Sequence, residues 1–368
     1  MKVLLIDLNR RSSDVYGRSI ARSLMERVEL KALISKYAGS LQQWRTDISN
    51  LYEIDTYTSG CEFVKRTITR EAIVEARAII AKEAPDIVYY PMLSPWTPLI
   101  HSQNQDAKLV STIHDLKLHQ GEWNPIINYM TAKSIRQSDG IIFLNGYSEE
   151  QFLQRRKDKL TTSIPLGAFD SYLTDEGDRY STESGRANIL FLGRILKYKG
   201  LGVLLKAYPI IKESVPDSRL IIAGQGNLAA YSKQIRLCAD VEIHNKYLSN
   251  IEINALMKTA DVLVLPYIDA SQSAILTIGQ VYGVPVIATN ICGLNEQIQD
   301  GITGVLVAPG NSEELANECV KLLRDPNLRE VLSRNEIEYV DCSLGWDTIA
   351  REIVSFFEKV LRTSEVAS

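Results

Sequence analysis

The sequence predicts an α/β protein built from two doubly wound, Rossmann-like domains. Short, continuous aliphatic runs such as Val3–Ile6 and Ile189–Leu192 alternate with longer stretches of helical periodicity along the chain. Uninterrupted apolar strands of this kind occur in parallel sheets that are covered on both faces. The length of 368 residues favours two such domains, because single hydrophobic cores rarely grow that large. Ligands of these sheets bind beyond the carboxyl ends of the strands.

In the first half, each expected strand is an apolar run that stops at polar or turn-forming residues. The polar stretch 175–188 contains two glycines and is expected to be a linker, which places the domains at residues 1–180 and 181–345. The elements expected before it are the strands Val3–Ile6, Asp86–Tyr90, Leu109–Ile113 and Gly140–Leu144 and the helix Gly17–Met25.

The second half repeats the alternation of strands and helices. Its final helix, residues 346–362, has a wide apolar stripe that indicates packing on a core. The expected strands are Ile189–Leu192, Arg219–Ala223, Val241–His244, Val262–Pro266, Pro285–Ala288 and Val305–Val307, and the helices are Leu201–Glu213, Ile251–Thr259, Ser273–Tyr282, Glu313–Leu323 and Asn327–Tyr339.

The composition excludes several classes of protein. The net charge of -4 is not that of a polycation, so no nucleic-acid partner is expected. The five cysteines are scattered, odd in number and without metal-type spacing, which indicates reduced thiols and a cytoplasmic setting with no metal. We find no apolar run of signal-peptide or membrane-spanning length, so any membrane contact is expected to be peripheral.

Several segments resemble glycosyltransferase family 4, also called group 1 glycosyltransferases. They are FLGRILKYKG (191–200), LIIAGQGNL (220–228), ADVLVLPYIDASQSA (260–274) and GVPVIATNICGLNEQIQDGITGVLV (283–307), with weaker similarity in TIHDLKLHQGE (112–122) and IPLGAF (164–169). The resemblance implies the GT-B fold, in which two Rossmann-like domains face a central cleft and the last helix, here 346–368, crosses back to the first domain. It also implies that a sugar moves, with retention, from a UDP- or GDP-linked donor to a glycan or lipid-linked acceptor, with no metal or other cofactor.

Two cations are expected to hold the donor diphosphate. By resemblance, Arg194 and Lys199 match the family's phosphate-binding pair, beside Gly193 at the end of a strand. Fixed positive charges stabilise a diphosphate as it leaves the sugar. The alternative to this phosphate-binding role is that the two residues belong to a solvated basic turn. The stretch Ser271-Gln272-Ser273 is expected to add hydroxyl, amide and helix N-terminal donors to the phosphate oxygens.

The nucleotide is expected to contact residues that follow later strands, each with a structural alternative. The glycines of a G-x-G turn let the backbone approach a ligand, but equally suit a tight turn. Tyr247 lies in an expected base-binding loop or an ordinary surface turn, and Glu296 is a donor contact or a helix-start acid. Ile278 replaces the second family glutamate, Asp269 is the nearest substitute for the first, and Cys292 replaces a family glycine. The candidate nucleotide-binding residues are Gly193, Gly224, Gly226, Tyr247, Asp269 and Glu296.

The acceptor is expected in the first domain. His114 and Asp115 directly follow the strand Leu109–Ile113 and are the candidate catalytic residues, although a lone histidine is often structural. Trp96 is a candidate for stacking on an acceptor sugar, against the alternative of a packed, proline-rich corner. His119 and Glu122 are further candidates on the acceptor side.

Three interpretations of function remain open. The main one is a retaining glycosyltransferase, which contacts the membrane surface through basic clusters such as Lys65-Arg66 with Arg70 if its acceptor is lipid-linked. The loss of the family glutamate at Ile278 supports the second, a non-catalytic GT-B subunit that assists another glycosyltransferase or binds a glycan. The third is an epimerase of the same fold that acts on the nucleotide-sugar alone.

Overall fold

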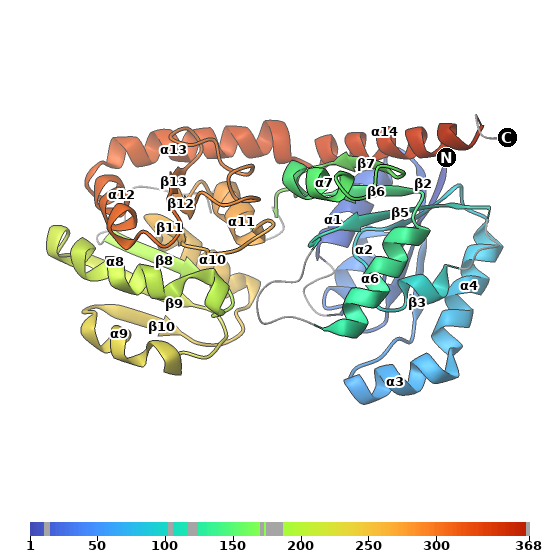
Figure 1. The fold of residues 1–368 in the computed structure, drawn as a ribbon, viewed down its shortest axis with the longest axis horizontal. Coiled ribbons are helices and arrows are strands. Elements are labelled where there is room, and N and C mark those ends of the chain that lie inside the picture. The colour runs from blue at the N-terminus through green and yellow to red at the C-terminus, as the bar shows by residue number, and fades with distance from the viewer. Residues whose placement is uncertain (11–14, 102–105, 117–123, 170–172, 174–186, 366–368) are drawn as a thin grey trace. The chain divides into compact units, whose positions relative to one another are not determined.

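The computed structural model describes residues 1–368 except 11–14, 102–105, 117–123, 170–172, 174–186 and 366–368 (Figure 1). The chain divides into two compact units. One consists of Met1–Leu118, Glu122–Pro165 and Trp346–Ser368, and the other includes Leu166–Gly345. Each unit is a parallel sheet whose strands alternate with helices, so the predicted pair of Rossmann-like domains is confirmed.

The first unit has a seven-stranded sheet in the order β3-β2-β1-β4-β5-β6-β7. After β3 the chain crosses to the other side of β1, where β4 pairs with β1. The carboxyl ends of β1 and β4 are therefore neighbours at the switch point, where the strand order reverses. The strands are β1 (Lys2–Asp7), β2 (Glu29–Ser35), β3 (Leu51–Ile54), β4 (Ile87–Tyr90), β5 (Lys108–Ile113), β6 (Gly140–Phe143) and β7 (Leu160–Ser163). The helices are α1 (Val15–Leu24), α2 (Leu41–Asp47), α3 (Gly60–Thr69), α4 (Glu71–Glu83), α5 (Thr97–Ile100), α6 (Pro125–Gln137) and α7 (Gly146–Leu153).

The second unit has a six-stranded sheet in the order β10-β9-β8-β11-β12-β13, with its switch point between β8 and β11. Its core consists of the apolar residues of the central strands packed against α8 and α12. The strands are β8 (Ala187–Leu192), β9 (Ser218–Ala223), β10 (Val241–His244), β11 (Val262–Leu265), β12 (Val286–Thr289) and β13 (Val305–Val307). The helices are α8 (Leu201–Ser214), α9 (Ser232–Leu237), α10 (Asn250–Thr259), α11 (Ala274–Tyr282), α12 (Ser312–Arg324) and α13 (Pro326–Tyr339), with short 3-10 helices at Lys197–Lys199 (η4) and Ala229–Tyr231 (η5) and a π-helix at Val340–Leu344 (η6).

The last helix, α14 (Trp346–Glu365), belongs to the first unit, as predicted. Its apolar stripe packs on that unit: Phe357 lies edge-on to Tyr89 with 5.2 Å between ring centroids, and Trp346 lies 5.8 Å from Tyr16 of α1. A Cβ on Gly140 would stand 2.6 Å from Val360, so α14 approaches β6 as closely as a glycine allows. Burial of these rings anchors the C-terminal segment.

Three strands of the first unit, β2, β3 and β7, were not predicted from the sequence. The segment that forms β2 reads ELKALIS, in which Lys31 interrupts the apolar residues. The segment that forms β7 reads LTTS and is half-buried throughout. β3, like β7, is an edge strand of the sheet, and it has only one fully buried residue. In β3 and β7 too few buried apolar residues follow one another to form the continuous aliphatic run that identified the other strands.

A buried carboxyl lies between α13 and β12. Oε1 of Glu336 accepts a hydrogen bond from the Val286 backbone N–H at 3.2 Å, and the side chain is fully buried. Burial raises the pKa of Glu336 well above its ordinary value of 4.5, and the bond from Val286 opposes this rise. The folded state therefore keeps a proton that the unfolded state releases, and it loses stability as pH rises from about 4.5 toward the raised pKa.

Glu336→Gln is expected to remove this pH dependence. The free energy of unfolding of the variant, relative to the parent, should increase with pH above about 4.5, by at most about 1.4 kcal/mol per pH unit. Denaturant unfolding between pH 4 and pH 8 measures the difference. Glu338→Gln, an exposed position on the same helix, is the control and should show no such trend. Parallel curves for Glu336→Gln and the parent would contradict the expectation.

Across the described part of the chain, the helices are all too short or too polar to cross a membrane.

Candidate functional site

The segments that follow β8 and β11 meet at the switch point of the second unit. The two strands are parallel neighbours, with Leu190 paired to Leu263. The segment after β8 contains Gly193, Arg194 and Lys199, and the segment after β11 contains residues 266–273. The topology therefore brings the predicted phosphate-binding residues to the edge where ligands of such sheets bind.

Close backbone packing fixes the loop that carries Lys199. Gly200, at the start of α8, has φ 72°, and a Cβ there would stand 1.7 Å from the carbonyl oxygen of Pro266. The Ile268 backbone N–H donates to the carbonyl oxygen of Tyr198 at 2.7 Å. Only glycine fits this contact without strain, so the sequence KYKG positions η4 directly against the end of β11.

The ammonium of Lys199 lies against aromatic rings. Its Nζ is 3.7 Å from the ring centroid of Tyr267 and 5.1 Å from that of Tyr198. Among the ion pairs of the described residues, none involves Lys199. Arg194 and Lys197, which precede it in the chain, are exposed. The site thus presents a half-buried positive charge that no carboxylate of the described residues neutralises.

The N-terminus of α11 lies beside Tyr267, but Ser273 has a different role from the one predicted. Its hydroxyl caps α11 by accepting from the Leu276 N–H at 3.3 Å, and its own N–H donates to Oε1 of Gln297 at 2.8 Å. The side chain is only 2% exposed. The prediction that Ser273 donates to phosphate is therefore corrected, because its polar groups are engaged within the protein. Ser271 and Gln272 are half-buried beside it.

The G-x-G turn after β9 serves the neighbouring loop. Gly224 has φ 138°, and a Cβ there would stand 1.9 Å from the carbonyl oxygen of Gly193. Gly226 forms a parallel bridge with Ile195, and its Cβ would stand 2.5 Å from the carbonyl oxygen of that residue. The close approach of these two loops accounts for both glycines without a ligand.

The other nucleotide candidates are exposed around the same edge. Tyr247 is 64% exposed, and Asp269 and Glu296 are also exposed. Glu296 lies in a series of turns, which excludes its interpretation as a helix-start acid. Ile278 is 2% exposed within α11, so the position of the second family glutamate contributes an apolar side chain to the core.

His114 follows β5 and lies against residues that follow β4 and β1, the two strands at the switch point of the first unit. Nε2 of His114 lies 2.9 Å from the carbonyl oxygen of Pro91, which follows β4. A carbonyl only accepts, so Nε2 carries the proton and Nδ1 of the neutral ring is an acceptor. Burial lowers the pKa of His114, which favours this neutral form. Tyr16 packs edge-on at 4.8 Å and fixes the ring. A neutral imidazole of this kind can accept a hydrogen bond from a hydroxyl.

The prediction that Trp96 stacks on an acceptor sugar is wrong, because the ring is buried. Its ring is 1% exposed, its Nε1 donates to Oγ1 of Thr67 at 2.8 Å, and it packs against Phe63 and Tyr57. No ring face is left for a sugar, and the packed proline-rich corner is the correct interpretation. Asp115 is half-buried next to His114, whereas His119 and Glu122 lie outside the described residues.

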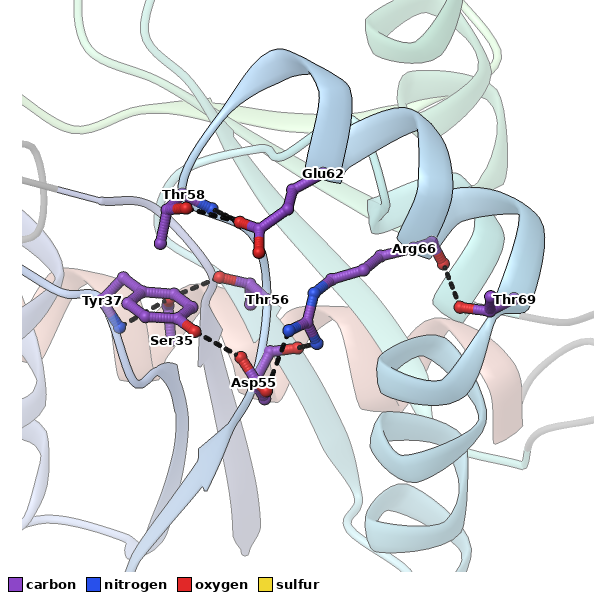
Figure 2. Close-up of polar contacts among 8 residues, drawn as sticks. All are labelled: Ser35, Tyr37, Asp55, Thr56, Thr58, Glu62, Arg66 and Thr69. Carbon is purple, nitrogen blue, oxygen red and sulfur yellow. Dashed lines mark hydrogen bonds and ion pairs between the residues drawn. The ribbon is translucent and has the colours of Figure 1, made fainter.

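Figure 2 shows a polar cluster at the carboxyl ends of β2 and β3. The Tyr37 hydroxyl donates to Asp55 at 2.7 Å, and Arg66 of α3 donates to the other carboxylate oxygen of Asp55 at 3.0 Å. The hydroxyls of Ser35 and Thr56 lie 2.6 Å apart and are buried. Arg66, part of a predicted basic surface cluster, therefore connects α3 to the segment after β3.

Residues 176–339 match the family model for Glycosyl transferases group 1. This match covers the switch point of the second unit, including Arg194, Lys199 and residues 266–273. The cations at that switch point therefore lie in the part of the chain that resembles the family.

Two known glycosyltransferases resemble part of the chain in sequence. An uncharacterized glycosyltransferase of Methanocaldococcus jannaschii is 30% identical over 175 residues, which are 46% of this chain and 44% of that protein. The D-inositol 3-phosphate glycosyltransferase of Paenarthrobacter aurescens is 33% identical over 182 residues, 47% of this chain and 44% of that protein. The chain therefore matches less than half the length of these relatives.

A solved structure extends the likeness of fold to the whole chain. HepE of Anabaena in complex with UDP has a TM-score of 0.74 and 16% identity, and the match covers 98% of this chain and 100% of that one. At this identity the likeness concerns the fold alone, which is GT-B. Within the described residues, His, Cys, Asp and Glu form no group of three or more suited to a metal ion.

Sequence reasoning missed Tyr267 and Gln297 at the site. The stretch YIDASQS was singled out for its serines and glutamine, whereas the structure shows that Tyr267 supports Lys199 and that Gln297 holds the start of α11. An aromatic residue directly after a strand and its proline was the available signal, but its partner lies 68 residues earlier in the chain. Only the fold brings the two together.

Proposed function

We propose that the chain is a retaining glycosyltransferase of family 4 that uses a UDP- or GDP-linked sugar. The observation that carries the proposal is the ammonium of Lys199 at the switch point between β8 and β11, half-buried and without an ion-pair partner among the described residues. Such a cation stabilises the negative charges of a diphosphate as it leaves the sugar, so a diphosphate is the ligand that suits it. The family match over residues 176–339 supports the same assignment.

In this proposal, Lys199 and Arg194 bind the diphosphate of the donor, and Ser271 and Gln272 contribute polar groups beside it. The acceptor hydroxyl attacks the anomeric carbon on the face that the diphosphate leaves, so the new C–O bond forms as the old one breaks. The hydroxyl proton passes to a phosphate oxygen of the leaving group. His114 of the first unit accepts a hydrogen bond from an acceptor hydroxyl through Nδ1. Resemblance also supports a reaction without a resident metal.

The acceptor is proposed to be a glycan or a lipid-linked sugar, and the enzyme to act in the cytoplasm. All five cysteines are free, which agrees with a reducing compartment. For a lipid-linked acceptor, α3 is the helix that would contact the membrane surface, since Val64 and Ile68 are 57% and 75% exposed beside Lys65.

A panel of nucleotides and nucleotide-sugars tests the proposal. We expect either UDP or GDP at millimolar concentration to raise the melting temperature, through binding to the folded state alone. The corresponding nucleotide-sugars should be hydrolysed slowly without an acceptor, and hydrolysis should persist in EDTA. The absence of any response to nucleotide would instead favour a non-catalytic subunit, which the apolar Ile278 also supports. An altered sugar on an intact nucleotide would indicate an epimerase.

A further inference from the structure

Two tyrosine rings surround the ammonium of Lys199. Nζ lies 3.7 Å from the centroid of Tyr267 and 5.1 Å from that of Tyr198, both within the range of cation–π attraction. The two rings are 0% and 5% exposed. They come from the segments after β11 and β8, so each side of the switch point supplies one ring.

The ring of Tyr267 is itself held in place. Its backbone carbonyl accepts from Oγ1 of Thr289 at 2.6 Å, which ties it to the end of β12. Its hydroxyl lies 3.3 Å from the Ser273 hydroxyl, which caps α11. The ring is thus fixed to two neighbouring elements of the same unit and offers a rigid surface to the lysine.

A π face orients a cation without neutralising it. Elsewhere in this chain lysines pair with carboxylates, as Lys212 does with Asp240 at 2.5 Å. A carboxylate beside Lys199 would compete with any anionic ligand, whereas a tyrosine ring attracts the ammonium through its quadrupole and has no net charge. A lysine side chain also loses conformational entropy when it is immobilised. This entropy loss weakens ligand binding unless the side chain is already held in place in the free protein.

We propose that Tyr267 is a positioning residue that prealigns the Lys199 ammonium for a diphosphate. The inference rests on the proposed function, because it takes a diphosphate as the ligand of Lys199. Tyr267 does not contact the ligand; it acts through the lysine. Binding strength therefore depends on the electron density of the ring as well as on its shape.

Phenylalanine analogues at position 267 separate these two properties. Tyr267→Phe keeps the ring face and should bind inorganic pyrophosphate about as tightly as the parent by calorimetry. Replacement of Tyr267 with mono-, di- and trifluorinated phenylalanine keeps the shape of the ring but progressively weakens its attraction for a cation. We expect a graded loss of pyrophosphate affinity that reaches about three- to thirtyfold for the trifluoro ring. The melting temperature of each full-length variant checks that the fold is intact.

The same series in a Lys199→Ala background is the matched control. Without the ammonium, fluorination should leave the remaining pyrophosphate affinity unchanged. If Lys199→Ala alone binds pyrophosphate as the parent does, the diphosphate assignment fails. If Lys199→Ala weakens binding but the fluorinated series is flat, the proposed function stands and Tyr267 is only a packing residue. A decline with fluorine content that persists without Lys199 would likewise overturn the inference.

Discussion

Lys199→Ala is expected to lower the rate of sugar transfer by about 10²–10³-fold. The diphosphate gains charge on its leaving oxygen as the glycosidic bond breaks, and a cation placed there stabilises the transition state more than the ground state. Losses of this size follow from removal of a single preorganised donor in other enzymes. Arg194→Ala should lower the rate in the same direction, since it is proposed to contact the same group. Initial rates with the donor found in the nucleotide-sugar panel measure both effects.

Lys197→Ala is the matched control for this prediction. Lys197 lies in the same 3-10 helix as Lys199, but its side chain is exposed and lies outside the proposed site. Its replacement removes the same charge from the same short helix and should change the rate by less than about twofold at moderate salt. Equal losses from Lys197→Ala and Lys199→Ala would show that the net charge of the loop matters and not the placement of one ammonium.

Gly200→Ala is expected to destabilise the second unit strongly. The residue has φ 72°, which costs an alanine about 1–2 kcal/mol, and its Cβ would stand 1.7 Å from the carbonyl oxygen of Pro266. Backbone atoms cannot move aside as a flexible side chain does, so about 1–3 kcal/mol of overpacking adds to the conformational cost. Relief of the clash would shift η4 away from β11, and pyrophosphate affinity should fall with stability.

Gly301→Ala isolates the steric part of that effect. Gly301 also has φ 72° and lies in the same unit, but a Cβ there would meet no atom within 4 Å. Its substitution should cost only the conformational part, about 1–2 kcal/mol, and should leave pyrophosphate binding unchanged. Denaturant unfolding of the two variants gives the difference directly. Equal destabilisation at both positions would contradict the proposed contact between Gly200 and Pro266.

The candidate site could be predicted in part, and the burial of its residues could not. The segments around Arg194, Lys199 and Ser271 were found because charged and polar residues follow apolar strands there and because these segments resemble those of a known family. Trp96 and Ser273 were assigned to ligands, although the structure buries the first among aromatic rings and uses the second as a helix cap. Whether a side chain is buried depends on partners that lie far away in the chain. The type of the residue does not reveal these partners.

The sequence by itself determined the fold class, the central strands of both sheets and the C-terminal helix, because continuous aliphatic runs and a helical apolar stripe need only local order to be recognised. Tertiary structure alone decided which strands lie at the edges and which glycines face a neighbouring loop. It also placed Tyr267 beneath Lys199. These features depend on contacts between residues far apart in the chain, and only parallel pairing of β8 with β11 brings the two segments to one edge.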